Sequence, residues 1–265
     1  MLYDKVNYTA DISYLTNVFI YEYDISKANI NILYSNGIIN KEIYDFLYSA
    51  ERMQRQVYVG KLCKDVNVSN ILKAGIIRAK KMLFEANNIE DRDVLSIKND
   101  AVFIINRKLF NTKFGMINFM QKNEYTSFYK IGHLEFYYYY SNFSKKEYID
   151  IKGISNEKIS LHEGYFLQIL KDLFYSIQTN GPEISLEMIK DIYNEYISLS
   201  LSVENYRNFD IKSMYHMNIF VNNNTGYYSD IIMDEQKNML DITTNLKILL
   251  EIQKIIISIY FNKYK

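Results

Sequence analysis

The chain has 265 residues, of which 48% are hydrophobic and 23% charged, and its formal net charge is zero. This composition excludes an intrinsically disordered protein and allows one large domain or two smaller ones, each with a buried core. The balance of charges excludes a strongly basic nucleic-acid-binding protein. Any surface for nucleic acid must therefore be a local basic patch.

Nothing in the sequence predicts secretion or a membrane span. The opening residues, MLYDKVNYTADISY, lack a basic stretch followed by an apolar one, so no signal peptide is expected. Cys63 is the single cysteine, which excludes an intramolecular disulfide and fits a reducing compartment. Lys247, Glu251 and Lys254 interrupt the apolar segment 246–261 at helical spacing, as in a buried amphipathic helix. We therefore expect a cytoplasmic protein with no membrane partner.

The N-terminal part of the sequence predicts one strand followed by helices. Residues 12–23 are apolar and β-branched, as is typical of a strand. Apolar residues then recur at steps of three and four, and Asn87 or Asn88 is the expected C-terminal cap of the last helix. The expected helices are 27–35, 40–63 and 69–88.

A hairpin and a meander of strands are expected next. Two short apolar runs meet at Lys98-Asn99-Asp100, where Asn-Asp favours a tight turn. The following segment is rich in aromatic and β-branched residues. The expected strands are 94–97, 101–105 and, within 114–152, segments separated near Asn123, Gly132 and Asn142.

The remainder of the chain predicts helices, with Asn180-Gly181-Pro182 separating two of them. This order of elements predicts an α+β protein in which an antiparallel sheet packs with helices and a mostly helical C-terminal region follows. The expected helices are 161–178, 184–200 and 238–262, with a loop at 221–230 inside the weakly patterned segment 203–236. A division into residues 1–155 and 156–265 is expected, unless the two parts form one continuous domain.

Two aspartates are placed to carry chemistry. Asp24 ends the first expected strand, and Asp100 lies at the tip of the hairpin. If the hairpin lies beside the first strand, the two carboxylates come together and can hold divalent ions about 3.5–4 Å apart for phosphoryl transfer. Mg²⁺ needs few protein carboxylates, because water and phosphate complete its octahedron. Each residue also has a structural interpretation, Asp24 as a helix N-cap and Asp100 as a turn residue.

The segment YDISKANINIL, residues 23–33, resembles motif A of family A DNA polymerases. Residues 70–105 resemble the helix before motif C in that family, followed by the motif C hairpin, which includes SIKNDAVF. The resemblance implies a polymerase palm in which Asp24 and Asp100 are catalytic and hold Mg²⁺ or Mn²⁺, with nucleotides and nucleic acid as partners. The sequence departs from the family at two positions: Asn99 replaces the motif C Asp, and Asn29 replaces the motif A Glu.

Basic residues around these motifs are the expected contacts with triphosphate, template or primer. Lys27 stands where the family has Gln, and Lys152 lies in a Lys-Gly segment that resembles one in family B polymerases. The cations of the helix 69–88, which include Lys80, alternatively form an ordinary solvated face. The candidate binding residues are Lys27, Arg52, Arg55, Lys61, Lys73, Arg78, Lys81 and Lys152.

Two functions remain open from the sequence. The first is a palm-like protein of nucleic-acid synthesis or binding, reduced or inactive because Asn99 and Asn29 lack the family's charge. The second is a non-catalytic binding or assembly protein that uses the sheet and the aromatic meander 114–152 as a partner surface. The small size and AT-rich bias fit a mobile-element or phage origin. An active palm must gather its acids in a cleft faced by cations, whereas a binding module is expected to expose an apolar patch.

Overall fold

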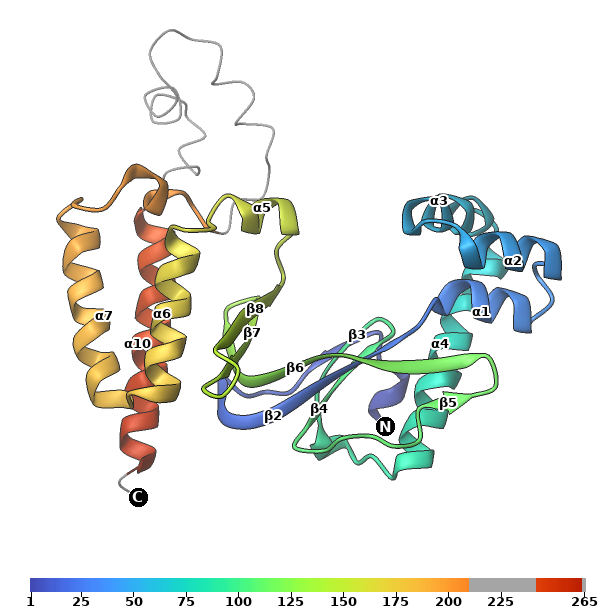
Figure 1. The fold of residues 1–265 in the computed structure, drawn as a ribbon, viewed down its shortest axis with the longest axis horizontal. Helices are drawn as coiled ribbons and strands as arrows, with labels where there is room; N and C mark the ends of the chain where they lie inside the picture. The colour runs from blue at the N-terminus through green and yellow to red at the C-terminus, as the bar shows by residue number, and fades with distance from the viewer. Residues whose placement is uncertain (210–241, 264–265) are drawn as a thin grey trace, which may run out of the picture. The chain divides into compact units, whose positions relative to one another are not determined.

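The structure, a computed structural model, describes residues 1–209 and 242–263 (Figure 1). Antiparallel strands pack with helices, and the C-terminal region is helical, so the predicted α+β class is confirmed. The predicted loop 221–230 and the first residues of the predicted helix 238–262 lie outside the described residues.

The chain folds into two compact units. Unit 1 consists of residues 1–11 and 18–125, and unit 2 consists of residues 12–17 together with the described residues from 126 onward. Each unit has its own hydrophobic core. The expected division into residues 1–155 and 156–265 stays a prediction.

The strands are hydrogen-bonded in the order β1-β3-β4-β2-β6-β7-β8, and β5 pairs with β6. The hairpin β3–β4 is almost entirely buried, which explains its near-continuous apolar sequence. The strands are β1 (Asn7–Thr9), β2 (Tyr14–Ile25), β3 (Val94–Lys98), β4 (Ala101–Ile105), β5 (Lys113–Phe114), β6 (Ile117–Ile131), β7 (Leu134–Ser141) and β8 (Lys146–Lys152).

Four α-helices belong to unit 1, where α1 and α4 pack against each other (Figure 1). Their backbones approach closely at Gly75, where a Cβ would overlap the side chain of Ile32. Leu33, Leu72 and Leu83 are buried between these helices and the strands. The helices are α1 (Ala28–Ser35), α2 (Lys41–Ser49), α3 (Arg52–Leu62) and α4 (Val66–Asn87), with short 3-10 turns η1 (Leu2–Asp4) and η2 (Asp91–Asp93).

In unit 2, three long helices lie side by side (Figure 1). The Phe174 ring on α6 stacks on the Tyr129 ring of β6, with their centroids 4.2 Å apart, at the centre of this core. The helices are α5 (Asn156–Ser160), α6 (Phe166–Thr179), α7 (Pro182–Ile197) and α10 (Ile242–Lys263), with the 3-10 turn η3 (Val203–Tyr206). No helix among the described residues is long and apolar enough to cross a membrane.

Aromatic side chains of the meander are mostly core. Seven of them on β6 and β7 are buried, so they do not provide the exposed partner surface expected over residues 114–152. Three tyrosine hydroxyls donate to glutamates at 2.6–2.9 Å. The buried aromatic residues are Phe119, Tyr125, Phe128, Tyr129, Phe136, Tyr137 and Tyr138, and the pairs are Tyr125–Glu22, Tyr137–Glu135 and Tyr138–Glu147.

Several predicted boundaries are confirmed. The C-terminal cap of α4 is Asn88, whose left-handed φ of 48° suits Asn. The turn at Gly132, with φ 60°, separates β6 from β7, and the break near Asn142 separates β7 from β8. Pro182 is the first residue of α7, as its missing N–H favours.

Three other predictions about the elements are wrong. The predicted helix 40–63 is two helices, because a capping box between Glu51 and Gln54 starts α3 afresh. The predicted break at Asn123 does not occur: β6 continues through it, and its amide donates to Glu22 Oε2 at 2.6 Å. The helix predicted from residue 161 begins at Phe166, after Gly164 with φ 78°.

Candidate metal and phosphate site

Pairing of β2 with β4 brings the two predicted aspartates together in unit 1. Tyr23 on β2 lies opposite Val102 on β4, so Asp24 comes next to the turn that precedes Ala101. That turn contains Asn99, with φ 56°, and Asp100. Asn tolerates this left-handed conformation better than most residues, which explains an amide here. The expected arrangement of hairpin beside first strand is therefore present.

The two carboxyl groups interact strongly. Burial, together with the Asp24 carboxylate and a hydrogen-bond contact with it, raises the pKa of Asp100 from 3.8 to about 6. The Lys122 ammonium acts in the opposite direction but is the weaker influence. Two like charges that share a partly buried site disfavour ionisation of one of them. The pair therefore carries negative charge that an opposite charge would stabilise.

A cleft of about 390 Å³ contains both aspartates and four cations. Lys27 lies at the start of α1, and Arg52 and Arg55 lie on α3. Asn29, at the position where the polymerase motif has Glu, also lines it. Three of the predicted binding residues thus face the same hollow as the predicted metal ligands, with Lys122 of β6 as the fourth cation.

Two of these cations are held by neighbouring backbone. The Lys27 ammonium donates to the carbonyl of Tyr48 at 2.6 Å and lies 3.3 Å from the centre of the Tyr48 ring. Burial and the charge of Arg55 lower the pKa of Lys27. Arg55 donates from Nη1 to the carbonyl of Ala50 at 2.6 Å. The Lys27 contact joins α2 to the beginning of α1, the Arg55 contact joins α3 to the end of α2, and both place positive charge at the cleft.

Two functional residues were missed by sequence reasoning, Lys122 and Glu22. Lys122 Nζ lies 3.7 Å from Glu22 Oε1 and 3.8 Å from Asp24 Oδ2. Glu22 is 1% exposed and accepts hydrogen bonds from Asn123 and Tyr125. Residues of β2 two apart lie on one face, so the acidic pair Glu22 and Asp24 is the signal that could have been used. Lys122 could not have been located without the position of β6 next to β2.

Lys80 was expected on a solvated helix face, and the structure corrects this. Its side chain is fully buried, and its ammonium donates to the carbonyls of Lys5 and Asn99. It therefore supports the hairpin and cannot contact a phosphate backbone.

The remaining predicted binding residues do not line this cleft. Lys61, Lys73 and Lys81 are exposed, and Lys81 forms an ion pair with Glu85. Lys152 belongs to unit 2, where its ammonium contacts Asp150 Oδ2 at 2.6 Å. Their proposed contacts with nucleic acid stay predictions.

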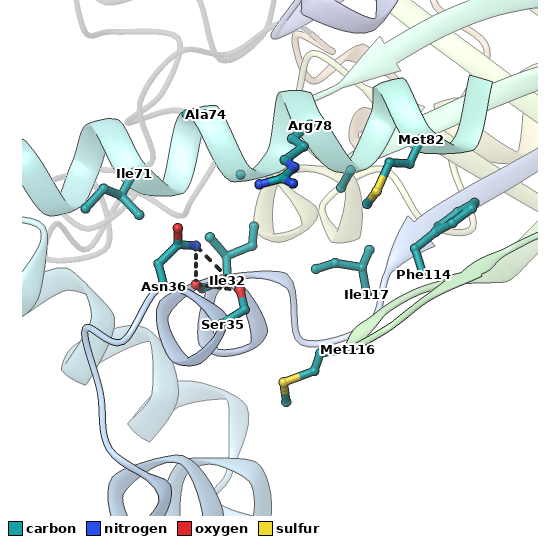
Figure 2. A pocket seen from close by; sticks show the side chains of 12 residues that line it. Ile32, Ser35, Asn36, Ile71, Ala74, Arg78, Met82, Phe114, Met116 and Ile117 are labelled. Carbon is teal, nitrogen blue, oxygen red and sulfur yellow. Dashed lines mark hydrogen bonds between the residues drawn. The ribbon is translucent and has the colours of Figure 1, made fainter. Parts of the chain in front are cut away.

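Arg78 lines a second cleft of unit 1, of about 410 Å³, between α1, α4 and the β5–β6 turn (Figure 2). Figure 2 shows its guanidinium above apolar side chains, including Ile32 and Ile117. Asn36 donates to the carbonyl of Ile32 at 2.8 Å and closes one side. This cleft contains no carboxylate, so it lacks the ligands that a hard cation requires.

The chemistry of the first cleft suits a hard divalent cation. Carboxylate oxygens are ligands for Mg²⁺ and Mn²⁺, and burial together with the Asp24 carboxylate raises the pKa of Asp100, so a cation bound to the pair would stabilise its ionised form. Within the described part of the chain, no group of three or more His, Cys, Asp or Glu side chains could hold a metal. An ion here would therefore depend on Asp24 and Asp100, with water and phosphate completing its coordination.

Comparison with known proteins places the chain in a phage family. Residues 1–258 match the family described as "Bacteriophage PBS1 gene 130 protein", and because the match covers most of the chain, the chain belongs to this family. Among curated proteins, none matches the chain. The phage origin expected from the sequence agrees with membership of this family.

Proposed function

We propose that the cleft around Asp24 and Asp100 binds a divalent cation together with the phosphates of a nucleotide or nucleic acid. In this proposal the protein is a reduced polymerase palm that acts in nucleic-acid synthesis or binding. The observation that carries it is the arrangement of one cleft, in which two interacting carboxylates face Lys27, Arg52, Arg55 and Lys122. A phosphoryl-transfer site needs carboxylates that face cations in one cleft, whereas an ordinary turn residue or helix N-cap does not.

Each residue has a defined role in the proposal. Asp24 and Asp100 hold Mg²⁺ or Mn²⁺, which when bound neutralises phosphate charge and polarises the phosphoryl group. Arg52 and Arg55 bind the phosphate oxygens that the ion does not. Lys122, whose side chain is 54% exposed, neutralises Glu22 and Asp24 while no cation is bound. With Asn99 at the position of the family's catalytic Asp, we favour binding with slow or no transfer over efficient polymerisation.

Mn²⁺ titration followed by electron paramagnetic resonance tests the metal site. We expect the wild-type protein to bind Mn²⁺ and to bind a nucleoside triphosphate more tightly in its presence. Asp24→Asn and Asp100→Asn should each weaken Mn²⁺ binding about tenfold or more, since an amide is a poor substitute for a charged ligand. Asp45→Asn is the matched control, because the Asp45 carboxylate forms an exposed ion pair with Lys41 on α2. Equal Mn²⁺ affinity in all four proteins would contradict the proposal.

A second experiment tests whether Arg52 and Arg55 bind the phosphates of a nucleotide. Arg52→Gln with Arg55→Gln should weaken triphosphate binding while Mn²⁺ affinity changes little, and Lys41→Gln, which removes an exposed cation paired with Asp45, should leave both unchanged. Primer extension with wild-type protein and Asp24→Asn then separates transfer from binding alone. Extension that survives Asp24→Asn would exclude this cleft as its site.

Exposed apolar side chains on α2 and α3 favour one alternative, a non-catalytic binding protein. Phe46 is 62% exposed, Met53 75% and Val57 55%. Such side chains are costly in water unless a partner covers them. If Mn²⁺ binding is absent and Phe46→Ser with Met53→Ser abolishes association with a phage protein partner, this second function replaces the first.

A further inference from the structure

One lysine in unit 1 is buried without any carboxylate in hydrogen-bond contact. The Lys80 side chain is 0% exposed, whereas the neighbouring Lys81 is about half exposed. Burial of an ammonium group is costly unless hydrogen bonds and nearby charges compensate for the lost water. Its contacts therefore indicate what it stabilises.

Those contacts converge on the hairpin turn. The Lys80 ammonium donates to the carbonyl of Lys5 and, at 3.2 Å, to the carbonyl of Asn99. The N–H of Asn99 in turn donates to the carbonyl of Val6 at 2.8 Å. Both backbone groups of Asn99 are thus tied down, one by α4 and the other by the N-terminal segment.

The position of Asp100 follows from these bonds. Asn99 has a left-handed φ of 56°, a conformation that non-glycine residues adopt when surrounding contacts support it. Asp100 is the next residue, and its direction depends on the peptide whose carbonyl Lys80 binds. The ammonium also attracts the carboxylates of Asp100 and Asp4.

We infer that Lys80 is a positioning residue for the metal site: from beneath the hairpin it holds Asp100 beside Asp24 in the geometry that a divalent cation needs. This inference rests on the proposed function and adds a residue that does not touch the ion. A buried cation is suited to the task because it supplies both donors and charge from one side chain, whereas a neutral residue supplies at most the donors.

The test compares Lys80→Met and Lys80→Gln with the control Lys41→Met, in Mn²⁺ titrations of protein shown by circular dichroism to be folded. We expect Lys80→Met to weaken Mn²⁺ binding about tenfold or more, as removal of a supporting residue of a metal ligand commonly does. Lys80→Gln should lie between Lys80→Met and wild type, because it keeps a donor and loses the charge. Lys41→Met should remain within about twofold of wild type, because the Lys41 side chain is exposed and pairs with Asp45 on α2.

A measurement on the wild-type protein covers the case in which these variants do not fold. The ammonium signal of Lys80 in nitrogen-15 NMR should shift when Mg²⁺ is added, while that of the exposed Lys41 should not. If wild type binds neither Mn²⁺ nor Mg²⁺, the proposed function fails and this inference fails with it. If wild type binds the ion but folded Lys80→Met binds equally well, or the Lys80 signal does not move, the inference alone is overturned.

Discussion

Asp100→Asn should stabilise the protein at neutral pH. Burial and Asp24 raise the pKa of Asp100 from 3.8 to about 6 in the folded protein. A raised carboxyl pKa means that the folded state binds a proton more tightly than the unfolded state does. The stabilisation by this proton is fully present below pH 3.8 and is lost as the pH rises through 6. At pH 7.5 the ionised Asp100 therefore destabilises the fold, and the amide removes this effect.

The magnitude follows from the shift. Each pKa unit corresponds to about 1.4 kcal/mol, so two units give about 3 kcal/mol as an upper value. Solvent screens this cleft, since the Asp24 side chain is 32% exposed, and we therefore expect about 1–2 kcal/mol. Unfolding by urea, followed by far-ultraviolet circular dichroism because the chain has no Trp, measures it at pH 7.5 and pH 5.

The comparison of the two pH values isolates Asp100. The advantage of Asp100→Asn over wild type should shrink by about 1 kcal/mol between pH 7.5 and pH 5, because wild type gains its proton in that range. Asp45→Asn should differ from wild type by less than about 0.5 kcal/mol at either pH, as expected for an exposed ion pair. If Asp100→Asn is less stable than wild type at pH 7.5, and equally so at pH 5, the cations of the cleft more than compensate the Asp100 charge and the reasoning is wrong.

Three further predictions concern the fold. Gly75→Ala should destabilise unit 1 by about 1–2 kcal/mol, because overlap of the new Cβ with Ile32 outweighs the gain in helix propensity. Gly60→Ala should stabilise it by about 0.5–1 kcal/mol, because no atom lies near the new Cβ. Urea unfolding of the two variants measures both effects. His162 is fully buried, and burial together with the charge of Arg207 lowers its pKa to about 4. Between pH 7 and pH 5 the unfolded state gains a proton at His162 that the folded state does not, so wild type should lose about 2 kcal/mol more stability than His162→Phe. Equal losses in the two proteins would contradict this. At Asn88, which has a left-handed φ, Asn88→Gly should stabilise the protein and Asn88→Ala should destabilise it, each by about 1 kcal/mol or less. Melting temperatures of the two variants test this order, and the reverse order would exclude backbone strain at this cap.

Local signals in the sequence were sufficient for most of the fold. Helical periodicity predicted α4 with a cap at Asn87 or Asn88, of which Asn88 is the cap, and the Asn99-Asp100 pair predicted the hairpin that carries the site. The same rules failed at Asn123, where the residue type suggested a turn. Its amide is instead satisfied by Glu22, which is distant in sequence, and the strand continues. The break at Ala50 was missed because the helical pattern on either side is similar, and only the capping box marks it.

Some residues of the candidate site could be predicted from the sequence and others could not. Asp24 and Asp100 could be predicted because each follows or precedes a recognisable strand. Lys122 and Lys80 could not, since their roles depend on which strands become neighbours and on which face of α4 meets the hairpin. A lysine on a helix is usually solvated, so the burial of Lys80 is visible only when the N-terminal segment is in place.

Two tyrosine–glutamate pairs join neighbouring strands of the sheet and favour the observed register. A slip of one residue between strands turns every apolar side chain to the wrong face, but a slip of two residues keeps the alternation and escapes that check. Tyr125 on β6 donates to Glu22 on β2, and Tyr138 on β7 donates to Glu147 on β8, so each pair joins two strands in the observed register. A two-residue slip would leave the buried Glu22 without this donor. Replacing Tyr125 by phenylalanine would keep the core's volume and leave Asn123 to hold the buried Glu22 in this register without the tyrosine hydroxyl.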